Sequence, residues 1–183
     1  YHLSVGNGSA AIVFRRKDPW VLAGRVEAHL TKEFSWPYSP PPRFNCNITV
    51  FASRGVEYVH ARIFMTIRQV GEAPTYPTFW SEKIENATME GIKPDYKDHP
   101  PPVDSYYPGF KERIGNTTWA DPAEIVFSEP ANYVYDVWVL FIDDKPETLG
   151  KVQEATVYID DLNARFYGAA YGPLGTDFWG RDI

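Results

Sequence analysis

The stretch YVYDVWVLFI, residues 133–142, is apolar on both faces of an extended strand except at Asp136. It is rich in Val, Tyr and Trp, which pack well on a pleated sheet. A strand with two apolar faces must be covered on both sides. The stretch therefore predicts a central strand in the middle of a sheet.

Residues 21–31, 46–52 and 57–68 each alternate between apolar and polar side chains. A period of two predicts strands with one buried face. Gly55 can supply a turn, so the second and third of these segments are predicted to form a hairpin. In the second segment Asn47 would point outward, because the inward face would consist of Cys46, Ile48, Val50 and Ala52.

The C-terminal part of the chain supplies further strands, at residues 151–160 and 162–167. They follow the central strand after a polar turn at residues 143–146, so we expect an antiparallel meander. The length of 183 residues, with 44% hydrophobic and 23% charged residues, suits one globular domain. We predict an all-β protein: a single antiparallel β-sandwich over residues 1–183, jelly-roll-like, with long loops rich in Pro and Tyr.

Periodicity is lost over residues 71–122, which are rich in Pro, Gly, Tyr and charged residues. We expect a long loop region there, with at most one short helix at residues 81–90. Long loops inside compact domains are commonly functional. This region is therefore the expected partner-facing part of the molecule.

Charge and hydropathy exclude two classes of partner. The formal net charge is −6, which disfavours binding to a phosphate backbone, so no nucleic-acid partner is expected. The longest apolar run, residues 137–142, has six residues, far fewer than the roughly 20 of a membrane-spanning helix. No membrane span is expected.

The chain contains four Asn-x-Ser/Thr sequons, at Asn7, Asn47, Asn86 and Asn116. They predict N-linked glycans and an extracellular or cell-surface location. A sequon only permits modification, so chance occurrence is the alternative explanation. The single cysteine, Cys46, can form no internal disulfide, so stability must come from the core.

Catalytic motifs are missing from the sequence. There is no nucleophile elbow, no phosphate-binding glycine loop and no zinc motif, so no catalytic residue is predicted. One enzymatic alternative needs no local motif: a polysaccharide lyase that uses polar residues of one sheet face. Its candidate residues would be Arg25, His29, His60 and Arg62.

Two acidic pairs, Asp143 with Asp144 and Asp160 with Asp161, each follow an apolar run. Carboxylates at a strand end can converge on a hard cation, and calcium is the expected metal. The alternative is that these residues only end strands through side-chain turns. The protein requires no cofactor in either case, but a structural calcium ion is possible.

The segment VYIDDL, residues 157–162, contains the pattern Tyr-Ile-Asp-Asp-apolar. It resembles the late strand of jelly-roll carbohydrate-binding modules, which includes a calcium ligand. The resemblance implies a β-sandwich fold and a calcium ion near Asp160 or Asp161. It carries over no sugar-binding residue.

Several aromatic residues lie in or beside the expected loops, where their rings could stack on sugars or on a neighbouring subunit. The alternative is that they cover the core beneath the loops. The candidate binding residues are Trp36, Tyr38, Trp80, Tyr106, Tyr107 and Trp119.

The first 14 residues contain two glycines and then a strand-like run at residues 10–14. Such a segment could complete the sheet of another molecule as a donor strand, or it could pair within its own chain. The candidate assembly residues are Leu3, Val5, Ala11, Ile12, Val13 and Phe14.

Three functional hypotheses follow. The leading one is an extracellular structural subunit of a filament, pilus or surface matrix, which assembles with itself by β-strand addition. The first alternative is a carbohydrate-binding module of a secreted protein, with a polysaccharide as its partner. The second alternative is the polysaccharide lyase.

Overall fold

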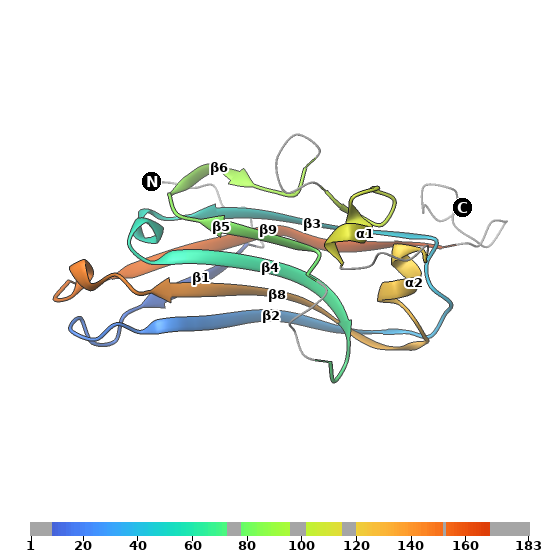
Figure 1. Cartoon of the computed structure of the whole chain (residues 1–183), viewed down its shortest axis with the longest axis horizontal. Helices are drawn as coiled ribbons and strands as arrows, with labels where there is room; N and C mark the ends of the chain where they lie inside the picture. Colours follow the sequence, from blue (N-terminus) through green and yellow to red (C-terminus); the bar gives the residue numbers. More distant parts are fainter. Residues whose placement is uncertain (1–8, 73–77, 96–101, 115–119, 152, 169–183) are drawn as a thin grey trace.

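The computed structural model describes residues 9–72, 78–95, 102–114, 120–151 and 153–168, which form two antiparallel sheets packed face to face (Figure 1). One sheet has the order β1 (Ala10–Arg15), β9 (Glu154–Tyr167), β3 (Arg43–Ala52) and β6 (Thr88–Ile92), and the short β7 (Val103–Asp104) also pairs with β3. The other sheet has the order β2 (Gly24–Trp36), β8 (Ala131–Asp143), β4 (His60–Gln69) and β5 (Trp80–Ile84). The predicted all-β antiparallel sandwich is confirmed.

Strand β8 is the central strand predicted from residues 133–142. It pairs with β2 along one edge and with β4 along the other, and most of its residues are buried. The outward face of β3 is also as predicted, because Asn47 is exposed while Cys46, Ile48, Val50 and Ala52 are buried.

The predicted hairpin over residues 46–68 is wrong. Strand β3 lies in one sheet and β4 in the other, and the short 3₁₀ helix η1 (Arg54–Glu57) carries the chain between them. Alternation shows that a strand has one apolar face. It does not show whether the next strand forms hydrogen bonds along the edge of the first strand, in the same sheet, or packs over its apolar face in the other sheet.

The predicted C-terminal meander is wrong for the same reason, because β8 and β9 lie in different sheets. The 3₁₀ helix η2 (Pro146–Thr148) lies between them. The two strands expected at residues 151–160 and 162–167 form one strand, β9, in which Asp161 adopts a left-handed backbone with φ of 52°.

Residues 71–122 hold more secondary structure than expected. The helix predicted at residues 81–90 is wrong, since β5 and most of β6 occupy that region. Both Trp80 and Ile84 are buried, and their spacing of four residues fits one face of a helix as well as alternate positions of a strand. The region also contains β7, the helix α1 (Phe110–Arg113) and the start of α2 (Pro122–Val126).

The core lies between the two sheets, which Figure 1 shows face to face. Near α1 and α2 the core is aromatic. Phe44 contacts the rings of Phe79, Phe110 and Phe127, with centroid distances of 5.5–5.6 Å. Asp121 begins α2 by accepting a hydrogen bond from the Ala123 N–H at 2.8 Å. Among the described residues no helix is long and apolar enough to cross a membrane.

Candidate functional site

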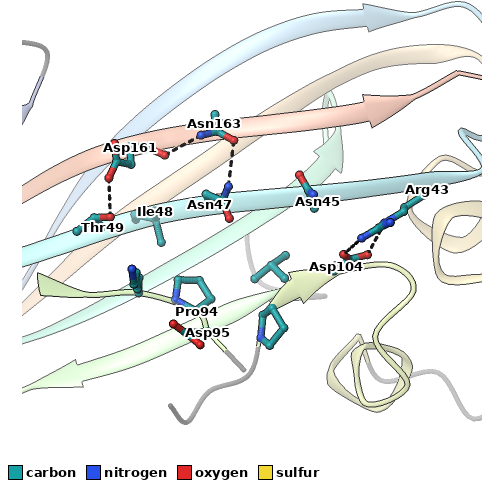
Figure 2. A pocket seen from close by; sticks show the side chains of 13 residues that line it. Arg43, Asn45, Asn47, Ile48, Thr49, Pro94, Asp95, Asp104, Asp161 and Asn163 are labelled. Carbon is teal, nitrogen blue, oxygen red and sulfur yellow. Dashed lines mark hydrogen bonds and ion pairs between the residues drawn. The ribbon is translucent and has the colours of Figure 1, made fainter. Parts of the chain in front are cut away.

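A polar groove of about 650 Å³ lies on the outer face of the five-stranded sheet (Figure 2). Strands β3 and β9 form its floor, and the segments at residues 93–95 and 102–104 form its wall. This volume is within the range of small-molecule sites in proteins. The floor consists of Asn45, Asn47, Ile48, Thr49, Asp161 and Asn163.

The alternation of β3 places planar polar side chains on this floor. Each outward residue lies between two buried ones, and the register sets Asn47 opposite Asn163 of β9. The Asn47 Nδ2 donates to Asn163 Oδ1 over 3.5 Å, which is a weak interaction. The amide of Asn47 is therefore only loosely held.

A β-bulge in β9 shapes the other end of the floor. Pairing passes from Asn47 with Asn163 to Thr49 with Asp160, so Asp161 and the residue after it face a single residue of β3. The left-handed backbone of Asp161 is one that aspartate tolerates better than most residues. Its Oδ2 accepts a hydrogen bond of 2.9 Å from the Thr49 hydroxyl, and its backbone oxygen accepts one of 3.1 Å from Asn163.

An ion pair borders the groove near β7. Arg43 of β3 binds Asp104, with 3.0 Å from Nε to Oδ1, and Asp104 Oδ1 also accepts the Tyr106 N–H at 3.0 Å. The Arg43 guanidinium carbon lies 5.1 Å from the ring centroids of both Tyr106 and Tyr167. Two aromatic contacts and two charge-assisted hydrogen bonds fix this side chain in place.

Asn45 brings an unused acceptor to the floor. Its Nδ2 donates to the Tyr167 hydroxyl at 3.0 Å, whereas its Oδ1 is shielded from solvent and has no hydrogen-bond partner in the described part of the chain. Shielded acceptors are nearly always paired in folded proteins. The Asn45 oxygen is therefore an unsatisfied acceptor that lies beneath the surface of the floor.

The charges around the groove nearly balance. Arg43 is neutralised by Asp104, which leaves Lys93 together with Asp95 and Asp161 among the lining residues. A strongly anionic or cationic ligand gains little from such a lining. The groove is suited to an uncharged molecule with many hydroxyl groups.

Of the four sequons, the structure describes two. Asn47 lies on the groove floor, and Asn86 is exposed between β5 and β6. Asn7 and Asn116 lie outside the described residues.

The acidic pairs do not gather into a metal site. Asp143 is buried, and its carboxylate binds Arg16, while Asp144 is exposed. Asp160 accepts hydrogen bonds from the Ser9 hydroxyl and from the Asp161 N–H. No group of three or more His, Cys, Asp or Glu side chains that could hold a metal occurs within the described ranges.

The aromatic candidates differ in exposure. Tyr106 and Tyr38 are exposed, whereas Trp80 is fully buried in β5, so the expectation that its ring could stack on a ligand is wrong. Tyr107 is half-buried, and Trp119 lies outside the described residues. A second pocket, of about 590 Å³, is mainly apolar. It is lined by all residues of the segment 36–42, which includes Trp36 and Tyr38, and by Tyr167 and Gly168.

The described part of the predicted donor strand pairs within its own chain. Ala11, Ile12, Val13 and Phe14 lie in β1, which is antiparallel to β9. Phe14 is buried and Val13 is exposed. Leu3 and Val5 lie outside the described residues.

The residues of the lyase alternative share the outer face of the four-stranded sheet but lie on two strands that are not neighbours. Arg25 and His29 belong to β2, His60 and Arg62 to β4, and β8 lies between them, so the backbones of the two pairs are roughly 10 Å apart. His60 binds Glu85 at 3.1 Å.

Another cluster on that face surrounds a fully buried aspartate of β8, Asp136. It binds His29 at 3.2 Å and Arg68 at 3.5 Å. The Trp138 ring stacks against His29 and Phe64, with centroid distances of 5.8 and 4.9 Å. Because these neighbours cover both ring faces, Trp138 offers no platform on which a sugar could stack.

The sequence interpretation missed Arg43, Asn45, Asp95, Asp104 and Asn163 as site residues. Asn45 could have been found, because the alternation that places Asn47 outward extends back to it. Asn163 and Asp104 could not, because their positions depend on which strands pair with β3.

The chain matches no protein-family model and no curated protein sequence. The functional inference therefore rests on the geometry of the groove.

Proposed function

We propose that the protein binds a carbohydrate, a neutral oligosaccharide or polysaccharide segment, in the groove on the five-stranded sheet. The observation that carries the proposal is the row of planar amide and carboxylate side chains on the floor, formed by Asn45, Asn47 and Asn163 with Asp161. Such groups donate and accept hydrogen bonds at fixed geometry, as the hydroxyl groups of a sugar require. Their near-neutral surroundings favour an uncharged ligand.

A tyrosine in contact with a groove-lining residue supports the same proposal. Tyr106 is 60% exposed, and its ring lies against the guanidinium of Arg43, which lines the groove. An exposed ring held in place can cover an apolar sugar face with little loss of side-chain entropy.

The strand order supports the finer, jelly-roll description of the fold. Without the two-residue β7, consecutive strands lie in different sheets at every connection except β4 to β5. This arrangement is expected of a jelly roll, a double-sheet architecture that also occurs in lectin domains. It agrees with the resemblance of residues 157–162 to jelly-roll carbohydrate-binding modules.

The proposal is tested with protein from a host that lacks N-glycosylation. Neutral oligosaccharides are screened on an array, and a hit is measured by calorimetry against Asn163→Ala. We expect about a tenfold loss of affinity, because one hydrogen bond of roughly 1.4 kcal/mol is removed. Asn132→Ala is the matched control, since Asn132 is exposed on β8 of the other sheet.

Two results would overturn the proposal. One is that no neutral carbohydrate binds the unmodified protein. The other is that Asn163→Ala binds a hit as tightly as the wild type while both variants keep the thermal stability of the wild type.

A second candidate function is self-assembly by strand addition. The observation that favours it is the position of β1, which lies at the edge of its sheet and pairs, among the described strands, with β9 alone. The matching strand of another copy could therefore replace it. Electron microscopy of the native material tests this hypothesis. Ordered filaments that vanish on removal of residues 1–14 would support it, whereas dispersed monomers in both samples would exclude it.

A further inference from the structure

We infer that N-glycosylation at Asn47 fills the groove and excludes its ligand, so that the modification switches the binding site off. The inference rests on the proposed carbohydrate-binding function. It arises from one juxtaposition: the acceptor asparagine of a sequon lies on the groove floor (Figure 2).

The position of the acceptor atom determines where a glycan would begin. The Asn47 side chain extends from β3 toward Asn163, with Asn45 and Thr49 on either side along the strand. The wall segments at residues 93–95 and 102–104 line the same cavity. A sugar bonded to Nδ2 starts inside this cavity, where a free ligand would also have to bind.

The chemistry of the transfer is that of a glycosyl diphosphate donor. The Asn47 Nδ2 forms a bond to the anomeric carbon of the donor sugar and loses one proton, while the carbon–oxygen bond to the diphosphate breaks and the diphosphate leaves with the bonding electrons. No oxidant or reductant is needed. The enzyme and the donor are supplied by the host.

The folded sheet restricts when this transfer can occur. Strand β3 is an interior strand, with β9 along one edge and β6 and β7 along the other. The Thr49 hydroxyl, which completes the sequon, donates to Asp161 at 2.9 Å. The Thr49 end of the sequon and the β3 backbone are thus held by pairing with β9, whereas the Asn47 amide is only loosely held, so we expect the modification to precede strand pairing. The choice between an open and a filled groove is then made once, while the chain folds.

The second described sequon provides an internal control. Asn86 is exposed in the connection between β5 and β6 and is not among the groove residues. A glycan at Asn86 adds similar mass and polarity to the surface but leaves the groove open. Any loss of binding that depends on Asn47 and not on Asn86 belongs to the groove.

The experiment compares wild type, Asn47→Gln and Asn86→Gln, each made in a host that N-glycosylates secreted proteins and in one that does not. Mass spectrometry of the peptides gives the occupancy of each asparagine, and calorimetry gives the affinity for a neutral oligosaccharide that binds the unmodified wild type. We expect glycosylated wild type and Asn86→Gln to bind at least tenfold more weakly than their unmodified forms. Glycosylated Asn47→Gln should bind as tightly as unmodified Asn47→Gln.

A second readout needs no ligand. Lys93 is exposed and lines the groove, whereas Lys151 is exposed and does not line it. Acylation of lysine amines, followed by mass spectrometry, should show a severalfold slower reaction at Lys93 when Asn47 is glycosylated, with Lys151 unchanged. The glycosylated Asn47→Gln variant should react at Lys93 like the unmodified protein.

The outcomes separate the two proposals. If no oligosaccharide binds the unmodified protein, the proposed function fails, and the reactivity of Lys93 still decides whether a glycan fills the groove. Equal reactivity of Lys93 with and without a glycan at Asn47 overturns the inference. Undiminished binding by protein with occupied Asn47 overturns it, as does an empty Asn47 in chains whose Asn86 is occupied.

Discussion

Arg16 and Asp143 form an ion pair that joins the two sheets. Their side chains are 1% and 0% exposed. Arg16 follows β1, and Asp143 ends β8 at the end of the sandwich opposite α1 and α2 (Figure 1). Arg16 also donates to the Thr148 backbone oxygen at 2.9 Å and to the Thr148 hydroxyl at 2.7 Å. The Ala23 N–H donates to Asp143 Oδ2 at 2.9 Å. The guanidinium and the carboxylate are therefore both fully buried and both hydrogen-bonded to further groups.

Removing one partner of this pair should strongly destabilise the fold. Asp143→Ala leaves the Arg16 guanidinium buried without its counter-ion, and we expect a loss of about 3–5 kcal/mol in the free energy of unfolding. Urea denaturation measures this loss. Arg15→Ala is the control, because Arg15 and Glu154 form an exposed pair and the change should cost at most about 1 kcal/mol. Equal losses in the two variants would contradict the buried role of Arg16.

The same pair predicts a loss of stability in acid. Burial opposes ionisation of Asp143, but hydrogen bonds from Arg16 and Ala23 outweigh it and hold the pKa below the ordinary 3.8. Because the folded-state pKa is lower than the unfolded-state one, this stabilisation is complete above the ordinary pKa. It is lost as the pH falls through the folded-state value.

The double variant Arg16→Met with Asp143→Leu tests this pH dependence. Apolar residues of similar volume can replace a buried ion pair at little cost in stability. The free energy of unfolding should therefore fall less for the double variant than for wild type between about pH 5 and pH 2. Parallel curves for the two proteins would show that Asp143 does not contribute to acid denaturation.

Gly55 should tolerate no side chain. A Cβ at this position of η1 would lie 1.7 Å from the Glu154 backbone oxygen of β9, so the connection between β3 and β4 would have to move. We expect Gly55→Ala to cost about 3 kcal/mol or more. Gly24→Ala is the comparison: its φ is +71° and no atom lies within 4 Å, so the cost is backbone strain of about 1–2 kcal/mol. Thermal unfolding of both variants measures these costs. Equal losses of stability in Gly55→Ala and Gly24→Ala would refute the prediction.

The Cys46 thiol should react only when the protein unfolds. It is the single cysteine of the chain and is buried on the inward side of β3. Burial raises the pKa of the thiol by disfavouring the thiolate, which is the reactive form. We expect slow maleimide labelling of the native protein and rapid, complete labelling in urea. Fast stoichiometric labelling of the native protein would show that the sandwich opens near β3.

Most individual strands could be predicted because their side chains alternate or are apolar throughout. The central position of β8 follows from its two apolar faces, and the exposure of Asn47 follows from the pattern of β3. Strands β5 and β6 were missed, because five-residue strands give too short a pattern to separate from a helix. The Pro- and Gly-rich segments beside them predict a loop whether the element between them is a strand or a helix.

The groove could be predicted only in part. Asn47 and Asp161 attract attention as a sequon and as half of an acidic pair, but nothing in the sequence brings them to one cavity. Their proximity depends on the pairing of β3 with β9 and on the bulge at Asp161. Both are long-range features of the sheet.

The sequence by itself determined the fold class, which face of β3 is buried and that β8 is covered on both faces, because the hydrophobic pattern is a local property of each strand. Only the tertiary structure decided that β3 and β4, and also β8 and β9, lie in different sheets. It also decided that Asp143 binds Arg16 and that Asn47 faces Asn163. An apolar face is buried equally well by any partner sheet, so partner choice and register depend on the packing of the whole domain.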